Sequence, residues 1–181
     1  LSPLVLCSAV PKGDRFDWLI EKSTEIGVTR FIPLLTTRSV VDPRSSKLDR
    51  LRHVVIAASK QCGRGRLMQL DTPMKFQELW VNDFAEHPMC VADPAGDTFD
   101  VLFDRLVTQT SNEGKRYTSS HALTSVVIVV GPEGGLTDEE LQTANAHHAK
   151  RLTLGRSILR IETAAILAAG LFRERMHRAA D

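Results

Sequence analysis

The sequence has 181 residues, of which 43% are hydrophobic, so it is long and apolar enough for one domain with its own core. Its 23 Lys and Arg nearly balance 22 Asp and Glu, which excludes a strongly basic protein and leaves only local basic patches for nucleic acid. Three cysteines, at positions 7, 62 and 90, lack paired metal-ligand spacing, and no apolar run approaches the ~20 residues that cross a bilayer. We therefore expect a cytoplasmic protein without disulfides, a metal site or a membrane span.

The first half of the sequence alternates strand and helix patterns. Residues 4–10 form an apolar run typical of a buried strand. Residues 14–26 have apolar side chains on one helical face, followed by Gly27 where a C-cap glycine belongs. A second strand is predicted at 31–35, and residues 46–62 again have helical spacing, with basic residues largely off the apolar stripe.

The middle of the sequence is less regular. Short strands are predicted at 68–70 and 89–93, with a short helix at 75–81 between them. Residues 108–124 are polar and rich in Ser and Thr, which predicts a surface insertion.

The last third contains the clearest pattern of a buried strand. Residues 125–130 are β-branched at nearly every position, as expected for a parallel strand covered on both faces. Thr137 and Glu140 form a capping-box pattern that begins a helix, and after a strand at 151–154 the final helix contains many small residues. The whole pattern predicts an α/β fold with a mainly parallel sheet flanked by helices.

Two strands of this last third run into glycine-bearing segments, at residues 131–135 and 154–165. Glycine permits positive φ and lets backbone amides come close to a ligand. Two such strand-to-helix switches, close together in the sequence, predict one small-molecule pocket built largely from main chain.

Other chemistries fit these residues poorly. The loop at 131–135 has no following Lys-Ser or Lys-Thr and is not a P-loop, and residues 63–65 lack the third glycine of a dinucleotide-binding loop. The Gly-x-Ser-x-Gly elbow of many hydrolases does not occur. Neither residues 147–148 nor residues 87–90 have the spacing of a metal site.

Six segments, in their order and spacing, resemble those of a known family. They extend over nearly the whole sequence: Lys12 to Arg15, Lys22 to Gly27, Thr37 to Val41, Gln61 to Arg64, Gly131 to Gly135 and Leu154 to Ala165. By these motifs the sequence is similar to the ribosomal RNA small subunit methyltransferase E family, within the SPOUT, or α/β-knot, methyltransferases.

The resemblance implies a fold, a cofactor and a reaction. It implies a SPOUT methyltransferase domain over residues 1–181 with a deep trefoil knot in its C-terminal half, a homodimer, and S-adenosylmethionine bound in the knot. It also implies methyl transfer to N3 of a uridine in small-subunit (16S) ribosomal RNA. Family members have a PUA-like RNA-binding domain before the strand at 4–10, and residues 1–181 do not include one.

By similarity, three loops enclose the cofactor, with apolar side chains against its adenine ring and main-chain groups at the ring's polar edge. Methyl transfer removes the sulfonium charge, so a pocket with little water suits the reaction. The residues implied are Ala92, Asp93, Pro94, Val130, Gly131, Pro132, Glu133, Gly134, Gly135, Leu154, Gly155, Ile158, Leu159 and Thr163.

The acceptor sets the harder chemical problem. Uridine N3 carries a proton and is a poor nucleophile until that proton leaves, so the site needs a base, or a cation that stabilises the uracil anion. We expect Arg160 to stabilise this anion or its phosphate and Glu162 to orient or deprotonate the uracil. The alternative is structural: Glu162 favours the N-terminus of the final helix and Arg160 pairs with it.

Basic residues elsewhere are candidates for RNA contact. By similarity, Arg38 faces substrate RNA near the cofactor of the other subunit and is a third catalytic candidate; the alternative is an exposed arginine without a role. Lys60, Arg64 and Arg66 form the best local basic patch, which either contacts RNA phosphates or is a solvated helix end. Lys12 is a further candidate for RNA contact, with a structural role as its alternative.

Two other functions stay open on the sequence. Methylation of a ribose 2′-hydroxyl or of another base is possible on the same fold, because cofactor loops do not choose the nucleophile. A non-catalytic RNA-binding or assembly module is the second, and the intact loops at 131–135 and 154–165 argue against it.

Overall fold

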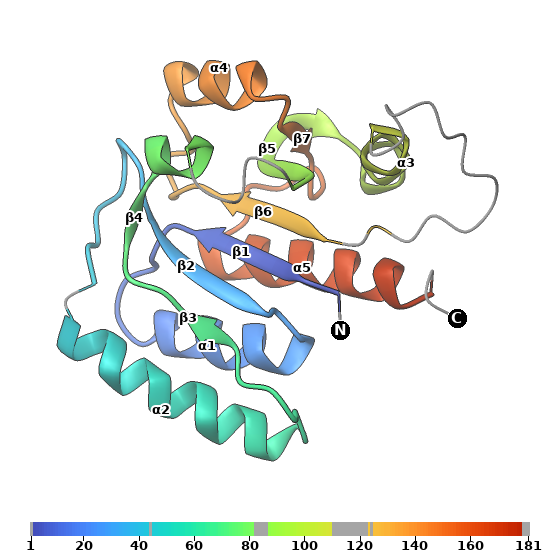
Figure 1. Cartoon of the computed structure of the whole chain (residues 1–181). Coiled ribbons are helices and arrows are strands. Elements are labelled where there is room, and N and C mark those ends of the chain that lie inside the picture. Colours follow the sequence, from blue (N-terminus) through green and yellow to red (C-terminus); the bar gives the residue numbers. More distant parts are fainter. Residues whose placement is uncertain (1, 44, 82–86, 110–122, 124, 179–181) are drawn as a thin grey trace.

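The computed structural model describes residues 2–43, 45–81, 87–109, 123 and 125–178. Their strands form a seven-stranded sheet in the order β3-β2-β1-β6-β5-β7, with β4 paired to β2 (Figure 1). The strands are β1 (Leu4–Ser8), β2 (Arg30–Leu35), β3 (Gln69–Leu70), β4 (Met74–Lys75), β5 (Met89–Asp97), β6 (Val126–Val130) and β7 (Lys150–Leu152). The helices are α1 (Arg15–Ile26), α2 (Ser45–Gln61), the 3-10 helix η1 (Phe76–Trp80), α3 (Phe99–Gln109), α4 (Asp138–Ala146) and α5 (Ile161–Arg178).

The centre of the sheet is β6, which is buried at every position, as its β-branched run predicts. It pairs in parallel with β1 on one side and with β5 on the other. The remaining pairs of described strands are also parallel. The predicted α/β fold with a mainly parallel sheet is therefore confirmed.

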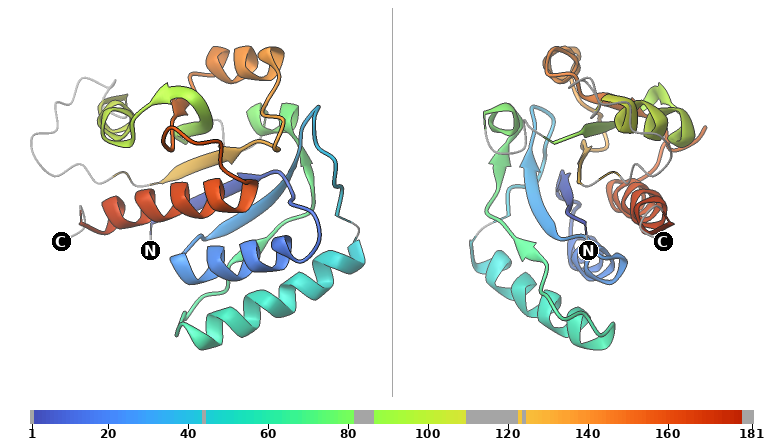
Figure 2. Two further views of the ribbon diagram at one scale, coloured as in Figure 1. Left: turned by 180° about the vertical axis from the view of Figure 1, so that it is seen from behind. Right: turned by 45° about the vertical axis from the view of Figure 1, so that its right-hand side comes forward.

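Alternate residues of the central strands pack into two separate cores. Leu6 of β1 and Ile128 of β6 belong to a cluster that includes side chains of α1, α2, α3 and α5. Cys7 and Val129, one position later, belong to a second cluster with η1 and α4. Successive side chains of a strand point to opposite faces, so helices cover both faces of the sheet. Figure 2 shows α1 and α5 against one of these faces.

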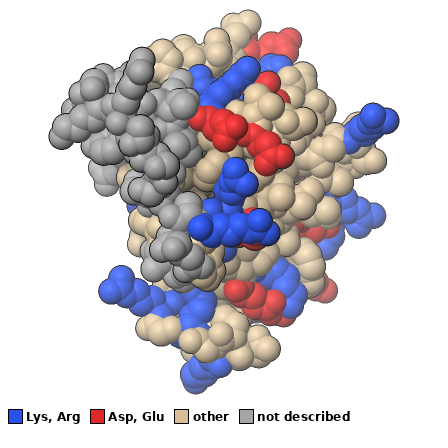
Figure 3. Space-filling model, turned by 90° about the vertical axis from the view of Figure 1, so that its right-hand side faces the viewer, with Lys and Arg blue, Asp and Glu red and all other residues tan. Residues whose placement is uncertain are grey.

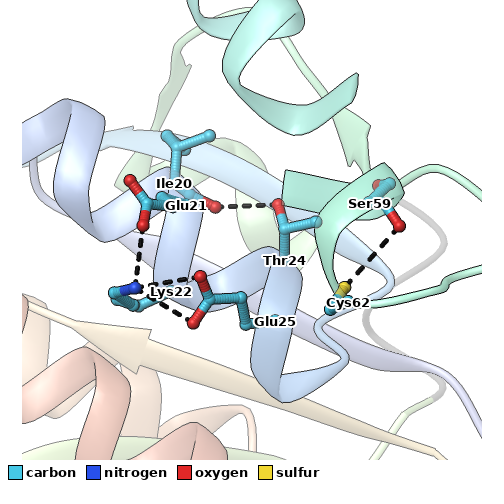
Figure 4. A network of polar contacts seen from close by, with 7 residues as sticks. All are labelled: Ile20, Glu21, Lys22, Thr24, Glu25, Ser59 and Cys62. Carbon is cyan, nitrogen blue, oxygen red and sulfur yellow. Dashed lines mark hydrogen bonds and ion pairs between the residues drawn. The ribbon is translucent and has the colours of Figure 1, made fainter. Parts of the chain in front are cut away.

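Helix α1 ends at Gly27, as predicted. This glycine has a φ of 99°, and its N–H bonds to carbonyls of the last helical turn. On the outer side of the helix, Lys22 lies 2.7 Å from the carboxylate of Glu21 and 2.9 Å from that of Glu25 (Figure 4). Exposed ion pairs contribute little to stability, so the apolar face and the cap are the main determinants of this helix.

Helix α3 was not predicted. It presents Phe99, Leu102, Phe103 and Leu106 at the spacing i, i+3, i+4, i+7, which is a helical signal in the sequence itself. The strand predicted at 89–93 continues to Asp97 as β5. A register shift against β7 between Ala92 and Asp97 accompanies this extension.

The other boundaries differ by a few residues. The short helix predicted at 75–81 is the 3-10 helix η1, preceded by the two-residue strand β4 that the sequence pattern did not predict. The strand predicted at 4–10 ends at Ser8, and the one predicted at 151–154 is β7 at 150–152. The predicted insertion at 108–124 lies mostly outside the described residues.

Because the strands are parallel, their carboxyl ends lie at one edge of the sheet, called here the carboxyl edge (Figure 1). The loops after β2, β6 and β7 meet there, while the loop that follows α2 lies at the opposite, amino edge. No helix of the described segments is both long enough and apolar enough to cross a membrane. The carboxyl edge is the usual place for a ligand in a sheet of this kind.

Candidate active site

An open cavity of about 120 Å³ lies at the carboxyl edge. Three segments surround it: the middle of β5, the loop after β6, and the loop that joins β7 to α5. Its lining consists of Ala92, Asp93, Pro94, Val130, Gly131, Pro132, Glu133, Gly135, Leu152, Leu154, Gly155, Ser157, Ile158, Leu159, Ile161 and Ala164. A mostly apolar lining with main-chain polar groups from glycine-bearing loops is typical of sites that bind small molecules or cofactors.

The structure brings the three predicted loops together. All of the residues predicted to bind the cofactor line this cavity except Gly134 and Thr163. Thr163 is exposed, whereas Ile161 and Ala164 of the same helical turn form part of the wall. Residues three apart share a face of a helix, so helical spacing from Ile161 would have selected Ala164 instead of Thr163. Sequence analysis also missed Leu152 and Ser157.

The loop after β6 is a tight turn. The N–H of Gly135 bonds to the carbonyl of Pro132 at 2.8 Å. Gly135 has a φ of 69°, a backbone conformation that residues other than glycine rarely adopt. A Cβ at Gly131 would lie 3.2 Å from the side chain of Leu136. Gly135 is therefore required by the turn, Gly131 leaves room for Leu136, and both keep main chain at the cavity surface.

The opposite wall is apolar and open. Leu154 and Leu159 are partly exposed, and the side chain of Ile158 is 88% exposed although it borders the cavity. Apolar side chains that face an open cavity bury surface only when a ligand covers them. This wall therefore suits a flat apolar group such as a heterocyclic ring.

Arg38 reaches the cavity loop from the loop after β2. Its Nη1 donates to the carbonyl of Gly134 at 2.6 Å and to that of Leu136 at 3.3 Å. Gly134 is thus absent from the lining but is held in place by Arg38. The structure gives this arginine a contact within its own chain, which neither interpretation of the sequence anticipated.

Arg160 and Glu162 have different environments. Arg160 lies just before α5 and is exposed, whereas Glu162 in the first turn is only 7% exposed. The Oε1 of Glu162 lies 3.4 Å from Nη1 of Arg15, and its Oε2 is buried without a hydrogen-bond partner among the described residues. The alternative pairing of Glu162 with Arg160 is therefore wrong, because the carboxylate pairs with Arg15, which sequence analysis did not select.

The predicted basic patch lies away from the cavity. Nη1 of Arg64 donates to the carbonyls of Thr24 and Val28, at 2.7 and 2.8 Å, at the C-terminal end of α1 and the amino edge of the sheet. Burial lowers the pKa of this guanidinium. Lys60 and Arg66 are exposed near it. Seen from the amino ends of the central strands, the surface carries Lys and Arg interspersed with Asp and Glu (Figure 3).

Lys12 is exposed in the loop between β1 and α1, at the carboxyl edge. Its carbonyl accepts a bond of 3.3 Å from Nε of Arg15. Of the predicted RNA-contact residues, Lys12 and Arg38 therefore lie at the same edge as the cavity.

Metal binding and thiol chemistry find little support in the described residues. They contain no group of three or more His, Cys, Asp or Glu side chains arranged to hold a metal ion. Burial raises the pKa of the Cys7 and Cys90 thiols far above the ordinary value, so both stay protonated inside the sheet.

The comparison with known proteins decides the family. A family model described as an RNA methyltransferase domain matches residues 1–173. The chain belongs to this family. The resemblance predicted from the motifs is thereby confirmed.

Curated relatives of the RNA methyltransferase domain share the same name. The Ribosomal RNA small subunit methyltransferase E of Synechocystis sp. PCC 6803 is 35% identical over 168 residues, which cover 92% of this chain and 51% of the relative. The Bacillus subtilis protein of that name is 32% identical, over 90% of this chain and 62% of its own length. The chain therefore spans between half and two thirds of the length of these relatives.

Solved structures agree with the fold. A Ribosomal RNA small subunit methyltransferase E from Neisseria gonorrhoeae bound to S-adenosyl methionine has a TM-score of 0.77 and 27% identity, over 96% of this chain and 66% of that one. The methyltransferase Lpg2936 from Legionella pneumophila, in complex with SAM, has a TM-score of 0.75 and 26% identity, over 96% and 66%. A TrmH/SpoU tRNA modifying enzyme of A. aeolicus, at 10% identity and a TM-score of 0.52, over 99% of this chain and 76% of that one, shares the fold alone. The SPOUT class of fold is confirmed.

Proposed function

We propose that this chain binds S-adenosylmethionine in the cavity at the carboxyl edge and methylates N3 of a uridine in small-subunit ribosomal RNA. The observation that carries the proposal is the meeting of the three predicted loops around one cavity, in a chain of the RNA methyltransferase domain family. The relatives named for ribosomal RNA methylation, and the solved relatives that hold this cofactor, support it. Since the proposed substrate is ribosomal RNA, the proposal includes activity in the cytoplasm.

The cavity suits the chemical groups of this cofactor, which supplies an electrophilic methyl group on sulfur when bound. The apolar wall of Leu154, Ile158 and Leu159 fits the adenine ring, and main chain of Gly131 to Gly135 fits its polar groups. Ile161 and Ala164 add apolar atoms to the cavity lining. A site with little water favours loss of the sulfonium charge in the transfer.

The acceptor side of the reaction belongs to residues around the first turn of α5. Arg160 is exposed next to the cavity wall and stabilises the negative charge of the uracil, or a neighbouring phosphate. Glu162 orients the uracil or accepts its N3 proton, for which its Oε2, buried and without a partner among the described residues, must become accessible to the RNA. Arg15 holds the other oxygen.

We also propose a homodimer formed around α5, with the trefoil knot of the SPOUT class in each subunit. The exposed side chain of Leu167 and the small residue Gly170 give α5 a surface on which a second helix can pack. Arg38 would then lie near the cavity of the other subunit as well as against its own loop. A dimer would also bring the Lys and Arg side chains at the carboxyl edges of both subunits to one RNA molecule.

Titration calorimetry with S-adenosylmethionine tests the cofactor. Binding with one site per chain supports the proposal, and absence of binding favours a non-catalytic RNA-binding or assembly module.

Mass-spectrometric mapping of the methylated nucleotide on small-subunit ribosomal RNA tests the acceptor. A methyl group on a ribose 2′-hydroxyl or on another base would contradict N3 of uridine while leaving the methyltransferase assignment intact.

A further inference from the structure

Two loops from separate strands are tied together beside the cavity. One follows β2 and contains residues 36–39; the other follows β6 and forms the cavity wall at residues 131–136. β1 lies between β2 and β6 in the sheet, so the two loops meet by reaching across its end. The contacts between them come from Thr37 and Arg38 on one side and from residues 134–140 on the other.

The first contact is a buried carboxylate that both loops share. Glu140 is 3% exposed, and its Oε1 accepts bonds from the N–H of Thr37 at 2.8 Å and from the Thr37 hydroxyl at 3.1 Å. Its Oε2 accepts the N–H of Thr137 at 2.8 Å, completing the predicted capping box at the start of α4. A buried charge is stable only when donors surround it, so the position of Thr37 and the start of α4 depend on one another.

The second contact is the guanidinium of Arg38 on two carbonyls of the cavity loop, those of Gly134 and Leu136. The stem of Arg38 also lies over Gly134, where a Cβ would come within 3.3 Å of its Cδ. Charge-assisted bonds to carbonyls are stronger than neutral ones. Nη1 alone donates to both carbonyls, so one nitrogen at the end of this side chain links two points of the loop.

We propose that Thr37 and Arg38 are positioning residues: they hold the loop at 131–136 in the shape that binds the cofactor. The inference rests on the proposed function and adds a role for residues that line no part of the cavity. Arg38 bonds to the loop directly, and Thr37 acts on it through Glu140 at the start of α4, so loss of either contact lets the wall relax and lowers affinity for S-adenosylmethionine. The fold itself has no need of the Thr37 hydroxyl, because the N–H of Thr37 still bonds to Glu140 without it.

The test compares matched variants by titration calorimetry with S-adenosylmethionine. Thr37→Ala removes the hydroxyl donor, and Thr37→Ser restores it; Thr143→Ala removes an exposed hydroxyl from α4 that bonds to the carbonyl of Glu139. We expect Thr37→Ala and Arg38→Ala to weaken binding on the order of tenfold, the scale of one lost charge-assisted bond. Thr37→Ser and Thr143→Ala should bind within about twofold of the wild type.

Melting of each variant without cofactor separates positioning from general stability. If Arg38→Ala melts much lower, Arg38→Lys carries the test, because it keeps the charge but its ammonium ends one bond short of the position of Nη1. Wild-type affinity in both Thr37→Ala and Arg38→Lys would overturn the inference. So would a loss of affinity that Thr37→Ser fails to restore. Absence of binding by the wild-type chain would instead contradict the proposed function.

Discussion

At the scale of single residues, the two oxygens of the Glu162 carboxylate are in unequal states. One pairs with Arg15, and the other is buried without a partner among the described residues. A buried acceptor without a donor is unfavourable by about 1–3 kcal/mol. A buried acceptor of this kind calls for an explanation, and a catalytic role is one: Glu162 does not line the cavity here, so it would have to turn toward the RNA to accept the N3–H of uracil.

Glu162→Gln should therefore slow methyl transfer by about 10²-fold, because the amide keeps the size of the side chain but is a very weak base. Single-turnover methylation measures this rate, and calorimetry should show cofactor affinity within about twofold of the wild type. Glu174→Gln, an exposed carboxylate on the same helix, is the control. An unchanged rate in Glu162→Gln would exclude proton transfer to this carboxylate.

Arg160 is predicted to act on charge that develops during the reaction. Arg160→Ala should bind the cofactor normally and methylate about 10²- to 10³-fold more slowly, the usual effect of removing one group that stabilises a developing anion. The same single-turnover assay applies. Arg156→Ala, an exposed arginine in the preceding loop, is the matched comparison. If Arg160→Ala methylates at the wild-type rate, its catalytic role is wrong.

At the scale of elements, the helices and strands that could be predicted are those with one strong local sequence pattern. β6 was predicted because five β-branched residues in a row fit a doubly covered strand, and α4 because Thr137 and Glu140 form a capping box. β4 was missed because two residues carry no periodicity; they are a strand only through pairing with Leu34 and Leu35 of β2. α3 was detectable, since its apolar spacing is present in the sequence.

The candidate site also contains features that the local sequence predicts and contacts that it does not. The main-chain loops could be predicted from glycine and apolar runs, and the wall residues Ile161 and Ala164 from helical spacing. The pairing of Glu162 with Arg15 links residues 147 positions apart, and that of Thr37 with Glu140 links residues 103 positions apart. Such contacts depend on which strands are neighbours in the sheet, and no local pattern encodes that order.

The C-terminal end of α1 shows an element whose stability depends on a predicted RNA-contact residue. Arg64 bonds to the carbonyls of Thr24 and Val28, while Arg173 bonds to Ser2 and to Gly27. Arg64→Ala should lower the free energy of unfolding by about 1–2 kcal/mol, measured by urea denaturation. Arg66→Ala, the exposed neighbour, should change it by less than about 0.5 kcal/mol. Equal stability of the two variants would contradict the capping role.

At the scale of the whole molecule, the two edges of the sheet have separate roles. The cavity, Lys12, Arg38 and Arg160 lie at the carboxyl edge, and the capping arginines lie at the amino edge. RNA that reaches the cavity therefore contacts Lys12 before Arg66.

Lys12→Ala should reduce the slope of log affinity against log salt concentration by about 0.7, the value for one phosphate contact with single-stranded RNA. Arg66→Ala should change this slope less, and the opposite ranking would place the RNA at the amino edge.

The final prediction concerns assembly of the whole chain. Leu167 is 39% exposed on α5, where a partner helix would cover it. Leu167→Glu should give a monomer by light scattering at micromolar concentration, because a carboxylate in an apolar helix contact is strongly unfavourable. Val81→Glu, at a more exposed apolar position outside α5, should remain dimeric. If the wild-type chain is itself a monomer at this concentration, the homodimer is wrong. A Leu167→Glu variant that stays dimeric would place the interface elsewhere on the molecule.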